Sequence, residues 1–487
     1  MSSIKKNLGL QTAYQVLSAC MPLITAPYLA RKLGAAQLGV FSFTSSVVAY
    51  FTLFAMLGTV NYGTKSIASC KGNRDRINEV FTSVFILQIL MTMLCVIAYG
   101  VYLLFFCHEN KFIALLQGIA LISCFLDINW LFWGVEDFKI TVTRSIIIKV
   151  VTVALILLLV KKQSDLWLYT LIMLGGTFIC NLVLFYYLPR YASFTKITWE
   201  TIKNHIAPNL VLFVPILAMS IYHTMDKTML GKLSTYTQSG YYYNSDKIVQ
   251  IPLLIINGIG TVMLPRMSAL LAEQKQKEAN ELFMTTLEGV AAVSIATLCG
   301  IAAVAREFIP FFFGPGYDAC IAITIVFTPI LLVKGFSVII RTQYLIPMGM
   351  EKEFTKSVVG GAILNLILNL FLIPPYGAIG AAAATVMAEF TACGLQFLSL
   401  RGKQLGLGEM LKKTVCYAGL GIAMIVLVRA VSLAQFNTIV KLIVEVLVGA
   451  IFYVSACLLL WQKTDNPFYL LLVKPALTKI HKFGLKP

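Results

Sequence analysis

Seven ionisable side chains lie inside or at the borders of long apolar stretches in this sequence. They form two Asp-Lys dipeptides twenty residues apart, two isolated lysines and one glutamate. On insertion scales, a charge at the centre of a bilayer costs about 2.5 to 3.5 kcal/mol, so such residues are candidates for contact with a substrate or a coupling ion. The candidates are Asp226, Lys227, Asp246, Lys247, Lys149, Lys334 and Glu389.

The two Asp-Lys dipeptides have two interpretations. Adjacent residues on a helix do not face one another, so an ion pair must cross between helices, for example from Asp226 to Lys247. In the first interpretation the dipeptides line a cavity, with Asp226 and Asp246 as ion-coupling carboxylates. In the second they form a structural salt bridge near the outer membrane interface. The sequence leaves both interpretations open.

The other charged candidates also have structural alternatives. Lys149 and Lys334 each need a carboxylate partner, backbone carbonyls or a wet cavity. Glu389, an ion-coupling candidate, can carry a proton or pair with a lysine, as can Glu288. Arg31, at the outer end of the first apolar stretch, either binds an anion or snorkels to the lipid headgroups.

Several polar and aromatic residues are expected at the membrane interface. Arg144 is predicted to contact lipid headgroups, and Asp127 with Asn129 is predicted to mark a helix end. The tryptophans fall at or just beyond the ends of apolar stretches, where an amphipathic indole ring is favoured. They are Trp130, Trp133, Trp167, Trp199 and Trp461.

Membrane helices must position these residues, because the chain is too apolar for a soluble protein. Of its 487 residues, 58% are apolar and 13% are charged, against about 25% charged in soluble proteins. Apolar windows of about 20 residues, the length that crosses a bilayer, predict about fourteen transmembrane helices. The sequence between them leaves no room for a large extramembrane domain. We therefore expect an all-α polytopic membrane protein.

Basic residues are distributed unevenly between the two sides of these helices. On the side of the N-terminus we count 26 of the 39 Lys and Arg residues, and on the opposite side 10. The positive-inside rule therefore predicts a cytoplasmic-membrane protein with both termini in the cytoplasm. The net charge of +17 reports this topology, not a nucleic-acid partner. Residues 65–79 and the C-terminal lysines suit anionic membrane lipids.

The sequence carries no motif for ATP hydrolysis, metal binding or nucleophilic catalysis. It has no G-x-x-x-x-G-K-[ST], H-E-x-x-H or G-x-S-x-G pattern, and its four histidines are scattered. Most of the eleven cysteines lie in apolar stretches and are expected as free thiols. We predict no enzyme, cofactor or metal. If the protein moves a substrate against its concentration gradient, the energy would come from an ion gradient, the membrane potential or consumption of the substrate on the far side.

A weak internal repeat indicates two related halves. Residues 4–34 and 202–231 each combine a basic start, a span with two prolines and a charged end, about 198 residues apart. Proline-interrupted spans at corresponding positions are typical of two-lobed transporters with a site between the lobes.

Several motifs in consistent order resemble the polysaccharide (oligosaccharide) flippase family of the MOP exporter superfamily. They extend from residue 4 to about residue 400. The motifs are A-P-Y-L-A-R-K-L-G at 26–34, L-G at 38–39, D-I-N-W-L-F-W-G-V-E-D-F at 127–138, D-K-T-M-L-G at 226–231, G-Y-Y-Y-N-S-D-K at 240–247, L-P-R-M-S at 264–268, Q-Y-L-I-P at 343–347 and I-P-P-Y-G-A-I-G-A at 373–381.

The resemblance implies a MATE-like fold of two pseudo-symmetric six-helix bundles around a central cavity, at residues 1–205 and 206–400. Residues 401–487 would add two helices and a basic cytoplasmic tail. The implied activity is alternating-access transfer of an oligosaccharide linked through pyrophosphate to a polyprenol, with polysaccharide polymerase machinery as a possible partner. The charged residues that match motif positions of the family are Arg31, Asp226, Lys227, Asp246 and Lys247.

Other functions predict different features. An ion-coupled exporter of small organic cations would need an acidic cavity, whereas the charges within spans include several lysines. A flippase for a lipid-linked cell-wall precursor would share the predicted architecture. A membrane-embedded polymerase, ligase or transferase would need a large outer loop with clustered catalytic residues, and the outer loops here reach only about a dozen residues.

Overall fold

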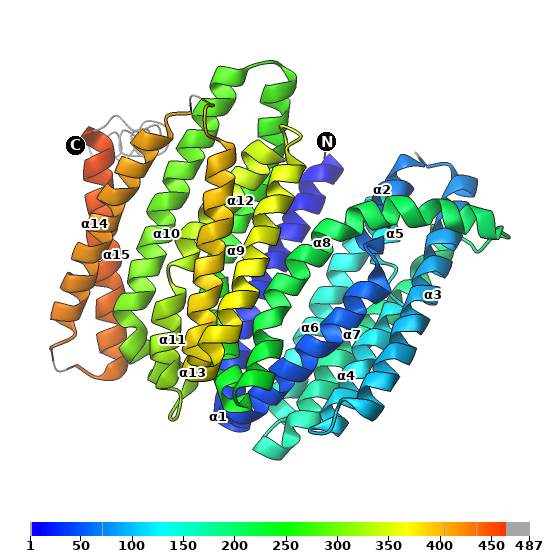
Figure 1. The fold of residues 1–487 in the computed structure, drawn as a ribbon, viewed down its shortest axis with the longest axis horizontal. Coiled ribbons are helices and arrows are strands. Elements are labelled where there is room, and N and C mark those ends of the chain that lie inside the picture. Colours follow the sequence, from blue (N-terminus) through cyan, green and yellow to red (C-terminus); the bar gives the residue numbers. More distant parts are fainter. Residues whose placement is uncertain (1, 71, 404, 435, 464–487) are drawn as a thin grey trace, which may run out of the picture. The chain divides into compact units, whose positions relative to one another are not determined.

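The computed structural model describes residues 2–70, 72–403, 405–434 and 436–463, and this part of the chain is almost entirely helical (Figure 1). The α-helices are α1 (Ser2–Met56), α2 (Thr59–Ser69), α3 (Arg74–Phe105), α4 (Lys111–Cys124), α5 (Asn129–Gly134), α6 (Phe138–Leu159), α7 (Leu166–Tyr187), α8 (Trp199–Leu233), α9 (Tyr236–Ala272), α10 (Gln276–Phe313), α11 (Ala319–Phe327), α12 (Ile330–Ile340), α13 (Glu351–Ser399), α14 (Leu407–Val431) and α15 (Thr438–Lys463). The expected all-α polytopic class is confirmed.

Eleven segments of the described chain are long and apolar enough to cross a bilayer. Two of them, Met21–Ser69 and Glu351–Ser399, are 49 residues each and contain a non-helical glycine. Helix α8 is not among the eleven. The count of fourteen therefore stays a prediction, while a multi-pass membrane protein follows from the helices themselves.

Glycines with positive φ divide the two longest helices. Gly34 has φ 76° and ψ 167° within α1, and Gly377 has φ 54° and ψ −128° within α13. Residues with a Cβ rarely adopt these angles, whereas glycine does so at little cost. The break that Pro374, Pro375 and Gly377 predict in the long apolar run of α13 is confirmed.

The chain forms two compact units that divide within α9 and α13. Unit 1 holds residues 1–244 and 368–381, and unit 2 holds residues 245–367 and 382 onward. The expected lobes at 1–205 and 206–400, with further helices at 401–487, follow a different division and stay a prediction. The predicted basic tail beyond residue 463 lies outside the described residues.

In unit 1, α1 packs against α3, α4, α6 and α8, and α4 packs against α7. One buried cluster centres on Trp130, Phe81 and Leu184, and another holds Tyr99 and Leu121. Burial of these large side chains between the helices fixes the scaffold that carries the charged residues of this unit.

In unit 2, α10 is the central helix. It packs against α11, α12, α14 and α15, and α14 also packs against α15. Figure 1 shows α14 and α15 running beside α10. The two C-terminal helices are therefore part of this compact unit.

Candidate functional site

A buried carboxylate, Asp226, lies at the centre of the polar contacts of unit 1. The Tyr242 hydroxyl donates to one carboxylate oxygen at 2.6 Å, and the Asn369 amide donates to the other at 2.6 Å. Asp226 is 2% exposed. Donors on both oxygens offset much of the cost of burying a polar group. Helices α8, α9 and α13 thus converge on one carboxylate.

The amide partner of Asp226 was missed by sequence reasoning, although a signal was present. Asn365 and Asn369 are four residues apart in a charge-free span, so they lie on one helix face. Both are fully buried. Polar residues at this spacing inside a membrane helix mark a functional or packing face.

Two motif glycines allow the helices around Asp226 to approach closely. A Cβ at Gly39 would lie 1.6 Å from the Tyr236 carbonyl oxygen, and one at Gly240 would lie 1.9 Å from the Ala35 carbonyl oxygen. No real side chain fits at these distances, so α1 and α9 touch through their backbones. A further contact joins α1 to α8, where the hydroxyls of Ser46 and Thr228 lie 2.8 Å apart.

Lys227 points to a different part of unit 1 from its neighbour Asp226. Its ammonium lies 5.8 Å from the centre of the Tyr243 ring, a distance that permits a cation–π contact. Tyr243 meets Phe41 edge-on at 6.3 Å, and Phe41 packs on Tyr169 at 4.8 Å. This lysine is therefore placed against an aromatic row.

The remaining basic candidates of unit 1 lie on α1 and α6. Lys149 donates to the Ser18 hydroxyl at 2.7 Å, which ties α6 to the first half of α1. Arg31 is exposed on α1, three residues before the break at Gly34.

The second Asp-Lys dipeptide belongs to unit 2. Asp246 and Lys247 are both partly buried on α9, and Asp246 accepts a hydrogen bond from Gln250 at 2.9 Å. The expected pairing of Asp226 with Lys247 joins the two units and stays a prediction.

Lys334 and Glu389 form a buried ion pair within unit 2. The ammonium lies 3.1 Å from the carboxylate, and the two side chains are 15% and 8% exposed. The pair joins α12 to the second half of α13. Of the two alternatives that the sequence left for Glu389, the structure shows pairing with a lysine.

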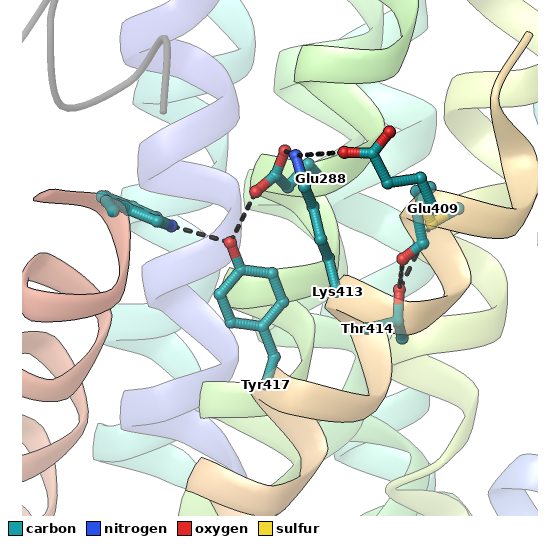
Figure 2. Close-up of polar contacts among 7 residues, drawn as sticks. Glu288, Glu409, Lys413, Thr414 and Tyr417 are labelled. Carbon is teal, nitrogen blue, oxygen red and sulfur yellow. Dashed lines mark hydrogen bonds and ion pairs between the residues drawn. The ribbon is translucent and has the colours of Figure 1, made fainter. Parts of the chain in front are cut away.

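Glu288 is also paired, in a contact that sequence reasoning did not assign to particular residues (Figure 2). Lys413 donates to one carboxylate oxygen at 3.0 Å, and the Tyr417 hydroxyl donates to the other at 2.8 Å. The Trp461 indole donates to the same hydroxyl at 2.7 Å. This chain of hydrogen bonds connects α10, α14 and α15.

A second ion cluster connects the same three helices near the opposite end of α10. Glu307 accepts from Arg429 at 2.7 Å and lies 3.3 Å from the Lys441 ammonium. Glu445 of α15 is fully buried beside it. Two partly buried polar contacts thus fix the C-terminal helix pair to α10.

The expectation that Arg144 contacts lipid headgroups is wrong. Arg144 is buried, and its guanidinium donates to Asn129 and, at 3.1 Å, to the Cys180 sulfur. Asn129 in turn donates to Asp127 at 2.7 Å. Asn129 of the motif at 127–138 therefore accepts a hydrogen bond from a buried arginine.

The membrane-interface prediction also fails for one tryptophan. Trp130 is fully buried and donates to Gln88 at 3.0 Å. Gln88 donates to the carbonyls of Cys124 and Asp127 at 2.6 and 3.0 Å. Trp167 and Trp199 are exposed, as a residue at the lipid interface would be.

Within the described chain, no three His, Cys, Asp or Glu side chains gather in a way that could hold a metal ion. The site candidates are carboxylates, lysines and tyrosines, which can form hydrogen bonds and recognise charge.

This geometry defines a multi-pass membrane protein with charged residues between its helices. The family described as "Polysaccharide biosynthesis protein" matches residues 4–271. The chain belongs to this family.

Two curated relatives match this chain over different shares of their length. A putative O-antigen transporter of Escherichia coli K12 is 24% identical over 411 residues, which is 83% of this chain and 98% of the relative. The probable low-salt glycan biosynthesis flippase Agl15 of Haloferax volcanii is 21% identical over 253 residues, which is 51% of this chain and 52% of the relative.

Solved structures share the fold at low sequence identity. The lipid II flippase MurJ, in an inward closed conformation, has a TM-score of 0.78 with 15% identity and covers 94% of this chain and 99% of its own. A multidrug-resistance MATE family transporter of the MOP superfamily, inward-facing, has a TM-score of 0.60 with 13% identity and covers 81% of this chain and 99% of its own. The expected MATE-like fold is confirmed.

Proposed function

We propose that this chain is a flippase that moves a polyprenyl-pyrophosphate-linked oligosaccharide across the cytoplasmic membrane for the synthesis of O-antigen, capsule or another surface polysaccharide. The observation that carries the proposal is the match to a putative O-antigen transporter over 98% of that protein. Basic side chains held within membrane helices support it, because a pyrophosphate headgroup needs cationic partners when it leaves water.

Lys149 and Lys227 are our first candidates for contact with the pyrophosphate. Lys149 is held in place by Ser18 and Lys227 lies against Tyr243, so both ammonium groups are positioned before substrate arrives, which lowers the entropic cost of binding. Arg31 and Lys247 extend this set as further cavity candidates.

Asp226 is our first candidate for coupling transport to an ion. Its burial and its donors on both oxygens mean that gain of a proton or a cation must rearrange the Tyr242 and Asn369 hydrogen bonds. Those bonds join three helices, so a change of charge at one atom can bias helix packing. Asp246 and Glu389 are the other coupling candidates, and Glu389 acts through its ion pair with Lys334.

The same proposal includes the membrane orientation and the partners. Both termini lie in the cytoplasm by the distribution of basic residues, and alternating access delivers substrate to the outer leaflet without ATP hydrolysis or covalent catalysis. Polysaccharide polymerase machinery would consume the delivered oligosaccharide.

A strain that lacks its own repeat-unit flippase tests the proposal. We expect expression of this chain to restore surface polysaccharide, and Lys149→Ala or Lys227→Ala to reduce it at least tenfold at equal protein level. Arg401→Ala, on an exposed residue outside the candidate set, is the control. The second arm of the experiment uses a strain depleted of its lipid-linked cell-wall precursor flippase. If the chain restores growth of that strain but not surface polysaccharide in the first, its substrate is the cell-wall precursor.

A further inference from the structure

A pocket lies among α2, α3 and α8 of unit 1, apart from the Asp226 and Lys149 contacts. Its volume is about 670 Å³, within the range of small-molecule sites, about 300 to 1,000 Å³. The three helices pack against one another, and Figure 1 shows the start of α3 and the start of α8 next to α2. The pocket is thus built by helices and not by a loop.

One end of the pocket is basic and rich in hydrogen-bonding groups. Lys65 of α2 and Arg76 of α3 supply two cations, and Ser66 and Asn204 supply neutral donors. Lys65, Arg76 and Asn204 are exposed to solvent. Cations and neutral donors of this kind bind phosphate oxygens.

The other end of the pocket is apolar. Val80 lies one turn beyond Arg76 along α3, and Pro208 and Leu212 lie one to two turns beyond Asn204 along α8. Arg76 and Asn204 therefore lie nearer the starts of α3 and α8 than these apolar residues do. A membrane phospholipid has the same order, with the phosphate at the interface and methylenes below it.

The balance of charge selects among phosphate-bearing lipids. Glu79 also lines the pocket, so Lys65, Arg76 and Glu79 sum to a single positive charge. A phosphodiester carries one negative charge and is neutralised by this set, whereas a pyrophosphate carries more and would meet the Glu79 carboxylate.

We propose that this pocket binds the phosphodiester headgroup of an anionic membrane phospholipid, with the phosphate at Lys65 and Arg76 and the first acyl methylenes against Val80 and Leu212. The residues that line this lipid site do not include Asp226 or Lys149. The inference does not depend on the flippase proposal, which serves only to assign the lipid to the cytoplasmic leaflet.

His205 and Tyr62 also line the pocket. A hydrogen bond of 2.6 Å joins the Tyr62 hydroxyl to Nδ1 of His205. This contact ties α2 to α8 and fixes the width of the pocket, so the bound headgroup would hold α2, α3 and α8 together.

Native mass spectrometry of the purified full-length chain in detergent tests this site. The ligands are phosphatidylglycerol, phosphatidylcholine of the same chain length, inorganic phosphate and farnesyl pyrophosphate. We expect phosphatidylglycerol to bind more tightly than the other three. The double variant Lys65→Gln with Arg76→Gln should weaken it about 25-fold, since a cation near the surface contributes about five-fold to binding of an anionic lipid.

Two further variants keep the test decisive. Arg401→Gln with Lys403→Gln removes the same two charges from exposed positions outside the pocket, and it should leave binding within about twofold. Glu79→Gln should raise the affinity for farnesyl pyrophosphate about five-fold relative to phosphatidylglycerol, by removal of a like charge.

Several outcomes would overturn the inference. If phosphatidylglycerol binding falls equally in the pocket variant and in the Arg401 control, the lipid is attracted by charge without a specific site. Inorganic phosphate binding as tightly as phosphatidylglycerol would show a free-anion site. Tighter binding of farnesyl pyrophosphate by the unmodified chain would make the pocket a substrate site.

Discussion

Two groups of polar contacts, one in each compact unit, differ in kind. In unit 1, Asp226 accepts hydrogen bonds from Tyr242 and Asn369, and Lys149 donates to Ser18, so these contacts join an ionisable group to neutral side chains. In unit 2, three glutamates lie in ion pairs with lysine or arginine. The pairs are Glu389 with Lys334, Glu288 with Lys413, and Glu307 with Arg429 and Lys441.

This difference separates two uses of charge. Loss of one partner from a buried ion pair leaves the other charge uncompensated and costs about 3 to 5 kcal/mol. A hydrogen bond to a neutral donor survives, in part, when the charge alone is removed. We therefore expect charge changes in unit 2 to affect folding first, and charge changes at Asp226 to affect transport first.

The largest effect is expected from breaking the Lys334 ion pair. Glu389→Gln leaves a buried ammonium facing an amide and should lower the free energy of unfolding by about 3 to 5 kcal/mol. Thermal unfolding in detergent measures this change. The double variant Lys334→Met with Glu389→Leu should recover most of the loss, and failure to recover it would mean that the pair does not act as a unit.

Gly240→Ala should cost about 3 kcal/mol in unit 1 without any change of charge. The new methyl group would overlap the Ala35 carbonyl oxygen at 1.9 Å, and overpacking against backbone forces the helices apart. Gly258→Ala in the same helix is the matched control, because nothing lies within 4 Å of its Cβ position. If both variants unfold alike, α1 and α9 are not in backbone contact.

Asp226→Asn should change transport more than stability. The amide keeps one acceptor oxygen but turns an NH2 group toward one of the two donors, which costs about 1 to 2 kcal/mol. Transport should fall at least tenfold, because the site no longer changes charge. Tyr242→Phe removes one donor and keeps the carboxylate, so it should retain more transport than Asp226→Asn; the reverse ranking would contradict the coupling role.

The smallest expected effect is a pH dependence at His205, in the second turn of α8. Burial lowers the pKa of His205 below its usual 6.5, and the Glu79 charge opposes this. The unfolded chain therefore gains the proton first, so the contribution to stability is present above about pH 6.5 and is lost as pH falls from there through the lower pKa of the folded chain. Between about pH 7.5 and about pH 5.5, the unfolding midpoint should fall more for the unmodified chain than for His205→Gln. Equal falls would contradict this assignment.

The sequence predicts depth in the membrane better than it predicts which way a helix faces. The apolar runs and the break at Gly377 follow from composition and backbone sterics, and both are observed. Trp130 and Arg144 lie near the ends of apolar runs, so hydropathy alone placed them among the lipid headgroups. Rotation about the helix axis turns both inward, toward Gln88 and Asn129.

Partners distant in sequence were the least predictable part of the site. Asp226 stands out as a charge in an apolar stretch, but its partner Asn369 is 143 residues away. Glu389 was expected to pair with a lysine or carry a proton, and only the fold shows that its partner is Lys334. No local pattern contains this information, because it depends on how helices pack.

Transfer of substrate between leaflets by the purified chain tests the central claim most directly. Proteoliposomes would carry a polyprenyl-pyrophosphate-linked oligosaccharide, with its exposure on the opposite leaflet followed over time by an added lectin. We predict that the chain accelerates exposure well above protein-free vesicles and that Asp226→Asn and Lys149→Ala slow it at least tenfold. Exposure at the rate of protein-free vesicles, from a folded and correctly reconstituted chain, would contradict the account.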